Sequence, residues 1–346
     1  MGLGGEKLST DNLAVALSIV VPVYNGEASV ATLVEELSRL DVPGGLEVVL
    51  VNDNSPDGSL NVCRELCSRN DVPLTVVNLA RNFGEHNAVM AGLTYARGAH
   101  VVTMDDDLQN PPEEVVRLWR YTRDGGFDVV YTRYAGKQHA VWRNFGSRLT
   151  NWCADRLLDK PKGIYLSSFR CMNSFTRQAI LDHTGPFPYV DGLITQVTQN
   201  LGVLEVHHLP RAEGRSNYTL RRLTRLFFSM LLNFSVTPLR IGALAGFAMA
   251  LLGVVGFVAV VVEALVSTGG PQGWPSLMAA TFLLAGVQLL MLGLLGEYLG
   301  RLFLTVNRKP QFVVRDIERN SRALGNEPGD IVDDLELRVR TGGYTQ

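Results

Sequence analysis

The sequence predicts an α/β domain with a largely parallel sheet, followed by two membrane-spanning helices. Short Val-rich apolar runs alternate with segments of helical periodicity over about residues 16–131, which is typical of strands joined by covering helices. Two long uncharged stretches lie in the last third of the chain, and 46% of all residues are hydrophobic. The net charge of -2 argues against bulk nucleic-acid binding, because no basic excess is present to neutralise phosphates.

The elements of the expected domain follow in order along the chain. Apolar runs predict strands at 16–23, 46–51, 74–79, 100–104 and 127–132. Helical periodicity predicts helices near 27–40, 58–69, 84–97 and 112–124. The less regular region 132–218 is expected to hold a helix from about 140, a strand-like run at 164–172, two short helical segments and a last strand at 201–209.

Two stretches have the length and composition of membrane spans. Ile241–Val262 and Ser276–Gly296 contain no charged residue, and 22 residues of helix measure about 33 Å, which matches a bilayer core. Arginines and a lysine cluster before the first span and after the second, whereas the Gly/Pro-rich link has none. The positive-inside rule therefore places both termini and the α/β domain in the cytoplasm, at the inner membrane. A buried helical hairpin of a soluble protein is the alternative.

The segment Leu220–Phe234 precedes the first span and is amphipathic. Its leucines and phenylalanines share one helix face, and Arg221, Arg222 and Arg225 fall largely on the other. This pattern favours an interfacial helix that meets anionic headgroups, with an amphipathic core helix as the alternative. Residues 1–15 lack the pattern of a cleaved signal peptide. The four cysteines give no disulfide or metal signature, so a reducing compartment fits.

These observations predict five regions. We expect a flexible N-terminus at 1–15, a cytosolic catalytic domain at 16–218, an amphipathic interfacial helix at 219–238, two transmembrane helices within 239–304 (about 241–263 and 276–298), and a cytosolic C-terminal tail at 305–346.

The run Val101–Glu114, VVTMDDDLQNPPEE, carries the main chemical signal. Three carboxylates directly after a buried strand repel one another, and a divalent cation relieves this repulsion. Asp105 and Asp107 lie on the same side of an extended backbone, with Asp106 on the other, and Gln109 supplies a third hard oxygen. A Mg²⁺ or Mn²⁺ site that holds a diphosphate leaving group is therefore expected. The alternative, a solvated turn or helix N-terminus, is preferred for Glu113 and Glu114.

Polar clusters also follow other expected strands. Tyr24-Asn25 comes after the first strand and Asp53–Ser55 after the second. Because ligands of such sheets gather at the carboxyl ends of the strands, these clusters and Asp105–Asp107 should converge on one crevice. Neither GxGxxG nor GxxxxGK[ST] is present, which argues against a dinucleotide oxidoreductase and a P-loop NTPase.

Together the segments SIVVPVYNGE, VVLVNDNSPDGS, LARNFGEHNAVMAGL and VTMDDDLQNPPEE resemble the inverting family 2 glycosyltransferases, which have the GT-A fold. The two-span tail with GLLGEYLGRL narrows the resemblance to membrane-anchored polyprenyl-phosphate glycosyltransferases, relatives of dolichyl-phosphate mannose synthase. Bacterial transferases that load undecaprenyl phosphate with glucose or an aminoarabinose derivative are the most similar group. The resemblance covers about residues 16–312.

The resemblance implies a role for each matching residue. The nucleotide-sugar site would comprise Pro22, Tyr24, Asn25, Glu27, Asp53, Asp105 and Asp106. Asp53 matches the aspartate that contacts the base. The metal would be held by Asp105, Asp107 and Gln109, and the lipid phosphate by Arg143, Ser147, Arg170, Arg211, Ser216 and Tyr218. Asp107 and Arg211 are the expected catalytic residues.

Four positions depart from the pattern of that family. Gly26 stands where a glutamate is frequent, and whether Glu27 replaces that carboxylate is left open. Asp106 stands where a small apolar residue is usual. Asn217 replaces a frequent lysine, and Ser168 precedes Phe169-Arg170 where some bacterial members have an aspartate.

The implied reaction is a single displacement, with inversion, of a sugar from a nucleotide diphosphate to a polyprenyl phosphate, for modification of a cell-envelope glycan. The acceptor phosphate is mostly a dianion at pH 7, so a dedicated general base is not needed. A UDP-sugar is favoured over a GDP-sugar, and a homo-oligomer is left open.

Three other functions are considered. A processive or other family 2 glycosyltransferase would share the carboxylates but usually has a QxxRW motif, which QHAVWR at 138–143 does not match. A catalytically silent membrane scaffold would tolerate loss of the aspartates, yet all are present. A non-catalytic sugar-nucleotide-binding membrane protein is the other alternative, which a hydrolysis and transfer assay would separate. His86, His207 and His208 are expected to be hydrogen-bonded structural histidines.

Overall fold

A computed structural model describes residues 15–134, 164–207 and 273–320, together with residue 322 and single residues between 242 and 266 that are helical. The chain divides into two compact units. One holds residues 1–145, 160–216 and 310–346, and the other holds 146–159 and 217–309. Several predictions fall outside the described residues: the interfacial helix at 219–238, and the roles of Arg143, Ser147, Arg211, Ser216 and Tyr218.

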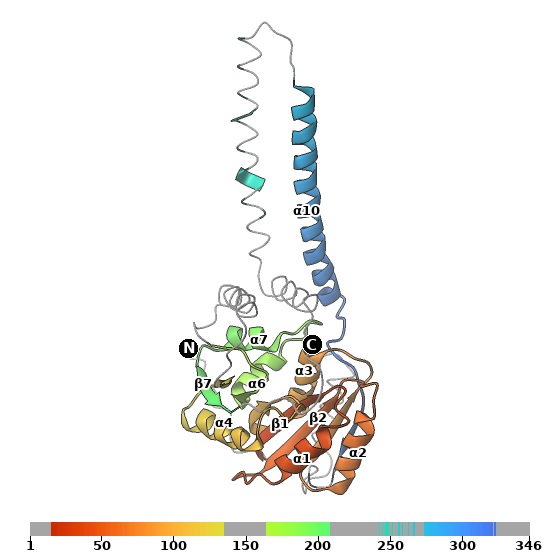
Figure 1. The fold of residues 1–346 in the computed structure, drawn as a ribbon, viewed down its shortest axis with the longest axis vertical. Coiled ribbons are helices and arrows are strands. Elements are labelled where there is room, and N and C mark those ends of the chain that lie inside the picture. Colours follow the sequence, from red (N-terminus) through yellow and green to blue (C-terminus); the bar gives the residue numbers. More distant parts are fainter. Residues whose placement is uncertain are drawn as a thin grey trace, which may run out of the picture. The chain divides into compact units, whose positions relative to one another are not determined.

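The first unit is built on an eight-stranded mixed sheet (Figure 1). Its strands are β1 (Val15–Val23), β2 (Leu46–Asn52), β3 (Leu74–Leu79), β4 (Gly98–Thr103), β5 (Val129–Tyr134), β6 (Arg170–Asn173), β7 (Leu201–Val206) and β8 (Val314–Arg319). They lie in the order β7-β5-β6-β4-β1-β2-β3-β8. β1 to β4 are parallel as predicted, whereas β6 and β8 run antiparallel to their neighbours.

The four helices predicted between 27 and 124 are present within a few residues of their predicted ends, and the two short helices predicted after 172 are present as well. They are α1 (Val30–Ser38), α2 (Ser59–Arg69), α3 (Glu85–Tyr95), α4 (Pro112–Asp124), α6 (Ser174–Leu181) and α7 (Val190–Val197). The helix predicted from about 140 lies outside the described residues. The strand-like run predicted at 164–172 is strand only from Arg170 onward.

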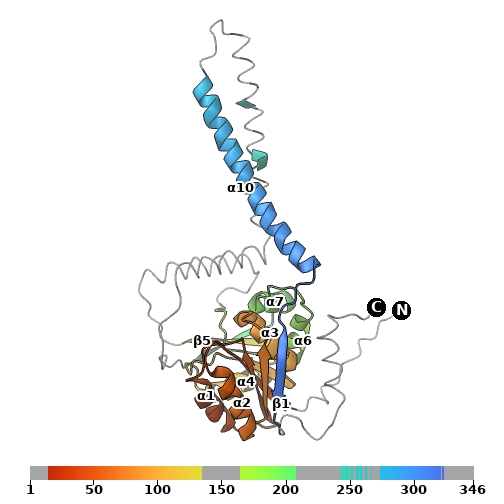
Figure 2. The same ribbon diagram turned by 90° about the vertical axis from the view of Figure 1, so that its right-hand side faces the viewer.

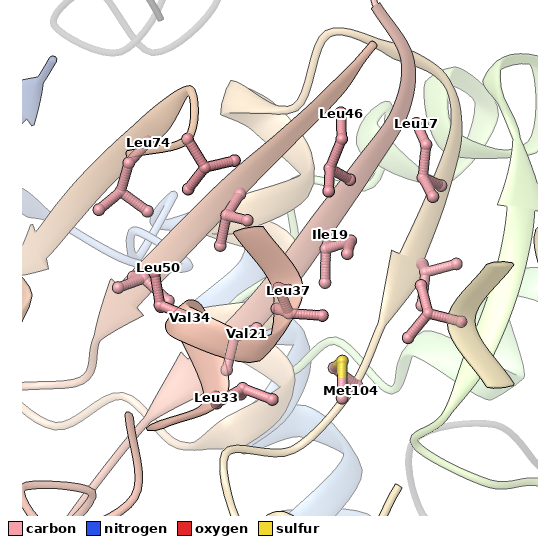
Figure 3. Packing of buried hydrophobic residues seen from close by; sticks show 14 of the residues in the cluster. Leu17, Ile19, Val21, Leu33, Val34, Leu37, Leu46, Leu50, Leu74 and Met104 are labelled. Atoms are coloured by element: carbon pink, nitrogen blue, oxygen red, sulfur yellow. The ribbon is translucent and has the colours of Figure 1, made fainter. Parts of the chain in front are cut away.

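The two faces of the sheet are covered by different helices. On one face, Leu33 and Leu37 of α1 pack over Ile19 and Val21 of β1 and Leu50 of β2 (Figure 3). Residues of α2 and α4 belong to the same apolar cluster. This cluster anchors β1, β2 and β4, whose carboxyl ends carry the candidate site.

On the opposite face, α3 lies against β1 and β2 at Gly92. A Cβ atom on Gly92 would lie 2.3 Å from Val20 Cγ1 and 3.0 Å from Val51 Cγ2. The absence of a side chain therefore lets the helix approach the sheet. The first turn of α3 lies at the carboxyl ends of the strands, where Gly84 N, directly before the helix, donates to Asp53.

β8 is the principal element that the sequence did not predict. The segment after the second span was expected to be a tail from residue 305, but Val314–Arg319 pairs with β3 and completes the sheet (Figure 2, blue strand). Asn320 holds its end, because its Oδ1 accepts from Leu74 N at 3.1 Å and its Nδ2 donates to Val72 O at 2.6 Å. The α/β unit therefore includes chain from both sides of the apolar region.

In the second unit, α10 (Trp274–Val306) is a helix of 33 residues. It is longer than the predicted span of 276–298. Leu284–Val306 is long and apolar enough to cross a membrane, and its large side chains are exposed, as with Leu289 (69%) and Phe303 (66%). Exposed apolar surface on this scale is typical of a face that contacts lipid or protein.

Candidate active site

The candidate site lies where the strand order of the sheet reverses. β1 has β2 on one side and β4 on the other, and all three are parallel. The connections therefore leave in opposite directions and open a crevice at the carboxyl ends of β1 and β4. Tyr24-Asn25 and Asp105–Asp107 follow these two strands directly.

The structure brings the three predicted polar clusters together. Asn25 N donates to Ser55 Oγ at 2.7 Å, which joins the turns after β1 and β2. A Cβ on Gly26 would lie 2.0 Å from Asp106 Oδ2, so the turns after β1 and β4 are also in contact. The predicted convergence is confirmed. Tyr24 is 48% exposed beside it, and Pro22 pairs with Val51 near the end of β1.

The carboxylates after β4 are positioned by short local contacts. Asp105 Oδ2 accepts from Ser168 Oγ at 2.7 Å, and Asp107 Oδ1 accepts from Gln109 N at 3.2 Å. Leu108, which lies between Asp107 and Gln109 in the chain, has a φ of 58°. This left-handed conformation is strained for a residue with a bulky side chain. This turn holds Asp105, Asp107 and Gln109 within one short segment.

The electrostatic environment of Asp105 is unfavourable for a negative charge. Burial, with smaller contributions from the nearby Glu85 and Asp107 carboxylates, raises its pKa to about 6, against the hydrogen bond from Ser168 and the charge of Arg170. Glu85 was not predicted to belong to the site. Its place in the first turn of a helix after a parallel strand was the available signal.

Asp53 is buried and holds the loop between β3 and α3. Its Oδ1 accepts from Phe83 N at 2.7 Å and its Oδ2 from Gly84 N at 2.8 Å. Burial raises its pKa even though these two hydrogen bonds act in the opposite direction. Asp53 thus positions the loop that begins α3, and a direct contact with a base stays a prediction.

Glu27 is used at the start of α2. Its Oε2 accepts from Gly58 N at 2.9 Å. Its own backbone N donates to Asp57 Oδ2 at 3.2 Å. Burial alone would raise the pKa of Asp57, but hydrogen bonds from Ser55, Ser59 and Glu27 together lower it. In this arrangement the Glu27 carboxylate stabilises the start of α2, and a contact with the nucleotide stays a prediction.

The two departures from the family pattern at Gly26 and Asp106 are in contact with each other. Asp106 Oδ2 occupies the space that a side chain at position 26 would fill. Burial and the negative charges of Asp106 and Asp57 raise the pKa of the Cys63 thiol to about 12. A carboxylate therefore lies beside position 26, and it belongs to Asp106, the aspartate expected on the side opposite to Asp105 and Asp107.

Arg170 does not lie where a lipid phosphate could reach it. It is 2% exposed, and its Nη1 donates to Asp191 Oδ1 in a buried ion pair. Tyr131 OH donates to the same oxygen at 3.1 Å. The prediction that Arg170 binds the acceptor phosphate is wrong, because its charge is already neutralised inside the domain.

Two family descriptions match the chain. "Glycosyl transferase family 2" matches residues 18–185, and "GtrB C-terminal hairpin" matches residues 237–302. These matches confirm the fold class predicted for the α/β domain and the hairpin that follows it.

Named relatives match over nearly the whole chain. Undecaprenyl-phosphate 4-deoxy-4-formamido-L-arabinose transferase of Pseudomonas syringae pv. syringae (strain B728a) is 34% identical over 322 residues, which is 91% of this chain and 94% of the relative. The transferase of the same name from Aeromonas hydrophila subsp. hydrophila is 34% identical over 313 residues, or 88% and 94% of the two chains.

A solved structure also matches part of the chain. Glucosyl-3-phosphoglycerate synthase from Mycobacterium tuberculosis, in complex with Mn²⁺, UDP and phosphoglyceric acid, has a TM-score of 0.46 and 18% identity, covering 63% of this chain and 78% of that chain. The relatives of 34% identity share nine-tenths of their length with this sequence. The chain therefore belongs to glycosyl transferase family 2 and carries the GtrB C-terminal hairpin.

Proposed function

We propose that the protein transfers a sugar from a nucleotide diphosphate to a polyprenyl phosphate at the cytoplasmic face of the inner membrane, with inversion. The observation that carries this proposal is the Asp105–Gln109 turn at the β1/β4 crevice, in a chain whose relatives act on undecaprenyl phosphate by name. The product would be a lipid-linked sugar for modification of a cell-envelope glycan. A UDP-sugar is the proposed donor.

The residues after β4 fit a hard divalent cation. Carboxylate and amide oxygens are the ligands that Mg²⁺ and Mn²⁺ prefer, and the raised pKa of Asp105 marks a carboxylate that lacks compensating positive charge. No group of three His, Cys, Asp or Glu side chains gathers around a metal position within the described residues. The proposed set of Asp105, Asp107 and Gln109 leaves the other coordination positions to the diphosphate and water.

When bound, the ion would neutralise the departing diphosphate. The residues of the chain contribute the remaining functions. Leu108 holds the strained turn that presents both carboxylates, and Ser168 fixes Asp105. Asp107 is the proposed residue nearest the reacting centre. Arg143, Ser147, Arg211, Ser216 and Tyr218 are proposed to hold the acceptor phosphate, which attacks as a dianion without a general base.

The sheet topology supports an even number of membrane crossings. β7 precedes the apolar region and β8 follows it, yet both belong to the same sheet. A chain that leaves this unit and returns to it must cross a bilayer an even number of times. Together with α10 and the matched hairpin at 237–302, this supports two spans with both termini in the cytoplasm.

Incubation of membranes containing the full chain with labelled nucleotide sugars and undecaprenyl phosphate tests the proposal. The panel should include UDP- and GDP-sugars, and the lipid extract should be analysed by mass spectrometry. We expect one lipid-linked sugar with one phosphate between sugar and polyprenol. A polymer would indicate a processive enzyme. Donor binding without any product would indicate a non-catalytic sugar-nucleotide-binding protein.

A further inference from the structure

His86 lies in the first turn of α3, next to Glu85. The edge of its ring packs on the ring of Tyr189, with centroids 5.0 Å apart and planes at 83°. Its Nδ1 is buried and has no hydrogen-bond partner among the residues that the structure describes. The prediction of a hydrogen-bonded structural histidine is therefore wrong for this nitrogen. A buried polar atom without a partner costs about 1–3 kcal/mol, so it calls for an explanation.

Two neighbouring groups share this property. Asn87 Oδ1 and Arg170 Nε are also buried without a hydrogen-bond partner in the described part of the chain, although Asn87 Nδ2 donates to Phe83 O at 2.7 Å. Arg170 is only 2% exposed. A buried donor or acceptor without a partner beside a proposed ligand site is a candidate for contact with that ligand.

These groups flank the proposed diphosphate site. Arg170 pairs with Thr103, two residues before Asp105 in the chain, and its charge lowers the pKa of both Asp105 and His86. Glu85, adjacent to His86, is the carboxylate outside the metal motif that raises the pKa of Asp105, and Gly84 N, directly before α3, donates to Asp53 at the end of β2. The first turn of α3 therefore lies beside the proposed diphosphate site.

The chemistry of His86 favours a neutral polar ligand. Burial lowers its pKa, and Arg170 lowers it further against the opposing effect of Asp191, so the ring is neutral at pH 7. A neutral imidazole has one donor and one acceptor. It suits a hydroxyl or amide group better than a phosphate, whose charge would need cationic donors.

We propose that His86 recognises the transferred sugar through a hydrogen bond to one of its hydroxyl or amide groups, beside the buried Arg170–Asp191 ion pair. This inference rests on the proposed function and adds the residue that selects the sugar. A site built to hydrogen-bond a sugar group discriminates against donors that lack it, because the buried nitrogen is then left unpaired.

His86→Phe tests the proposal, since phenylalanine keeps the ring that packs on Tyr189 and removes both nitrogens. We expect kcat/KM for the preferred donor to fall by about tenfold or more, the effect of one lost hydrogen bond. The corresponding deoxy-sugar donor should lose much less in the same variant. His86→Asn, which returns a polar group near the Nδ1 position, should recover part of the activity.

His183→Phe is the matched control. His183 also has a buried ring nitrogen without a partner in the described residues, Nε2. Its pKa is lowered by burial alone, without an effect of Arg170 or Asp191, and it follows α6. This variant should keep both kcat/KM and the order of sugar preference. Thermal unfolding of each variant establishes that it is folded.

The two proposals fail in different ways. If the wild-type chain makes a lipid-linked sugar and His86→Phe keeps its kcat/KM and its sugar preference, the role of His86 is refuted and the proposed function stands. If the wild-type chain transfers no sugar from any donor, the proposed function is refuted, and the role of His86 falls with it.

Discussion

Asp105→Asn should stabilise the metal-free protein while it removes activity. The pKa of Asp105 is about 6 in the fold against an ordinary value of 3.8, and each pKa unit corresponds to 1.36 kcal/mol. Ionised Asp105 therefore destabilises the metal-free fold by up to about 3 kcal/mol at pH 7.5. Asparagine removes the charge and still accepts the hydrogen bond from Ser168. For a domain of this size the gain corresponds to roughly 6–12 °C in the melting temperature.

The pH dependence of this difference follows from the sign of the shift. A raised carboxyl pKa means that the folded state binds its proton more tightly than the unfolded state, so stability is lost as the pH rises from 3.8 through about 6. The advantage of Asp105→Asn should be complete above pH 6 and should shrink as the pH falls toward 3.8. Mn²⁺ at pH 7.5 should stabilise the wild-type chain and not the variant.

Thermal unfolding of the full chain in detergent with EDTA, at several pH values, measures these effects. Asp57→Asn is the matched control, because the pKa of Asp57 is lowered: hydrogen bonds from Ser55, Ser59 and Glu27 outweigh the effect of burial. Loss of this carboxylate should destabilise the chain by about 1 kcal/mol, because the hydrogen bonds at the start of α2 are weakened. A metal-free Asp105→Asn chain that melts at or below the wild-type temperature at pH 7.5 would refute the electrostatic reasoning.

Three further predictions concern the framework of the site. Gly26→Ala places a Cβ 2.0 Å from Asp106 Oδ2 and should cost about 1–3 kcal/mol in unfolding free energy. Asp106→Gly in the same chain should recover most of this loss, whereas additive losses would argue against a contact between positions 26 and 106. Arg170→Met strands the buried Asp191 carboxylate and should cost about 3–5 kcal/mol in unfolding free energy. Adding Asp191→Leu should restore much of this stability, whereas losses that simply add in the double variant would exclude a coupled pair. Asn320→Ala removes the side-chain hydrogen bonds to Leu74 N and Val72 O and should lower the free energy of unfolding by about 1–3 kcal/mol. The readout is faster amide hydrogen exchange in β3, and unchanged exchange would show that β8 does not stabilise the sheet.

The sequence predicted the parts of the fold that depend on local patterning. Continuous apolar runs such as 46–51 are buried on both faces of the sheet, so their position in the centre could be read directly. β8 was missed because VRDIER carries four charges among six residues and pairs only at an edge of the sheet. The partners of β8 are about 250 residues away along the chain, as with Arg64, which pairs with Asp316 and Glu318. Contacts at this separation leave no local pattern in the sequence.

The candidate site divides in the same way. The convergence of the strand-end clusters followed from the parallel topology alone. The roles of Glu27 and Arg170 did not, because they depend on partners distant in sequence, Gly58 and Asp191. The contact between Gly26 and Asp106 likewise needed coordinates, although both residues stood out as departures from the family pattern.

Asp107→Ala tests the central claim most directly, because this carboxylate is proposed to hold the metal and the donor diphosphate next to the reacting carbon. The measurement is the initial rate at which lipid-linked sugar forms from the preferred donor and undecaprenyl phosphate, with Mg²⁺ or Mn²⁺ and with EDTA. The account predicts that the wild-type rate falls to background with EDTA, and that the folded Asp107→Ala chain stays at background with either metal. A wild-type rate in the Asp107→Ala chain would contradict it.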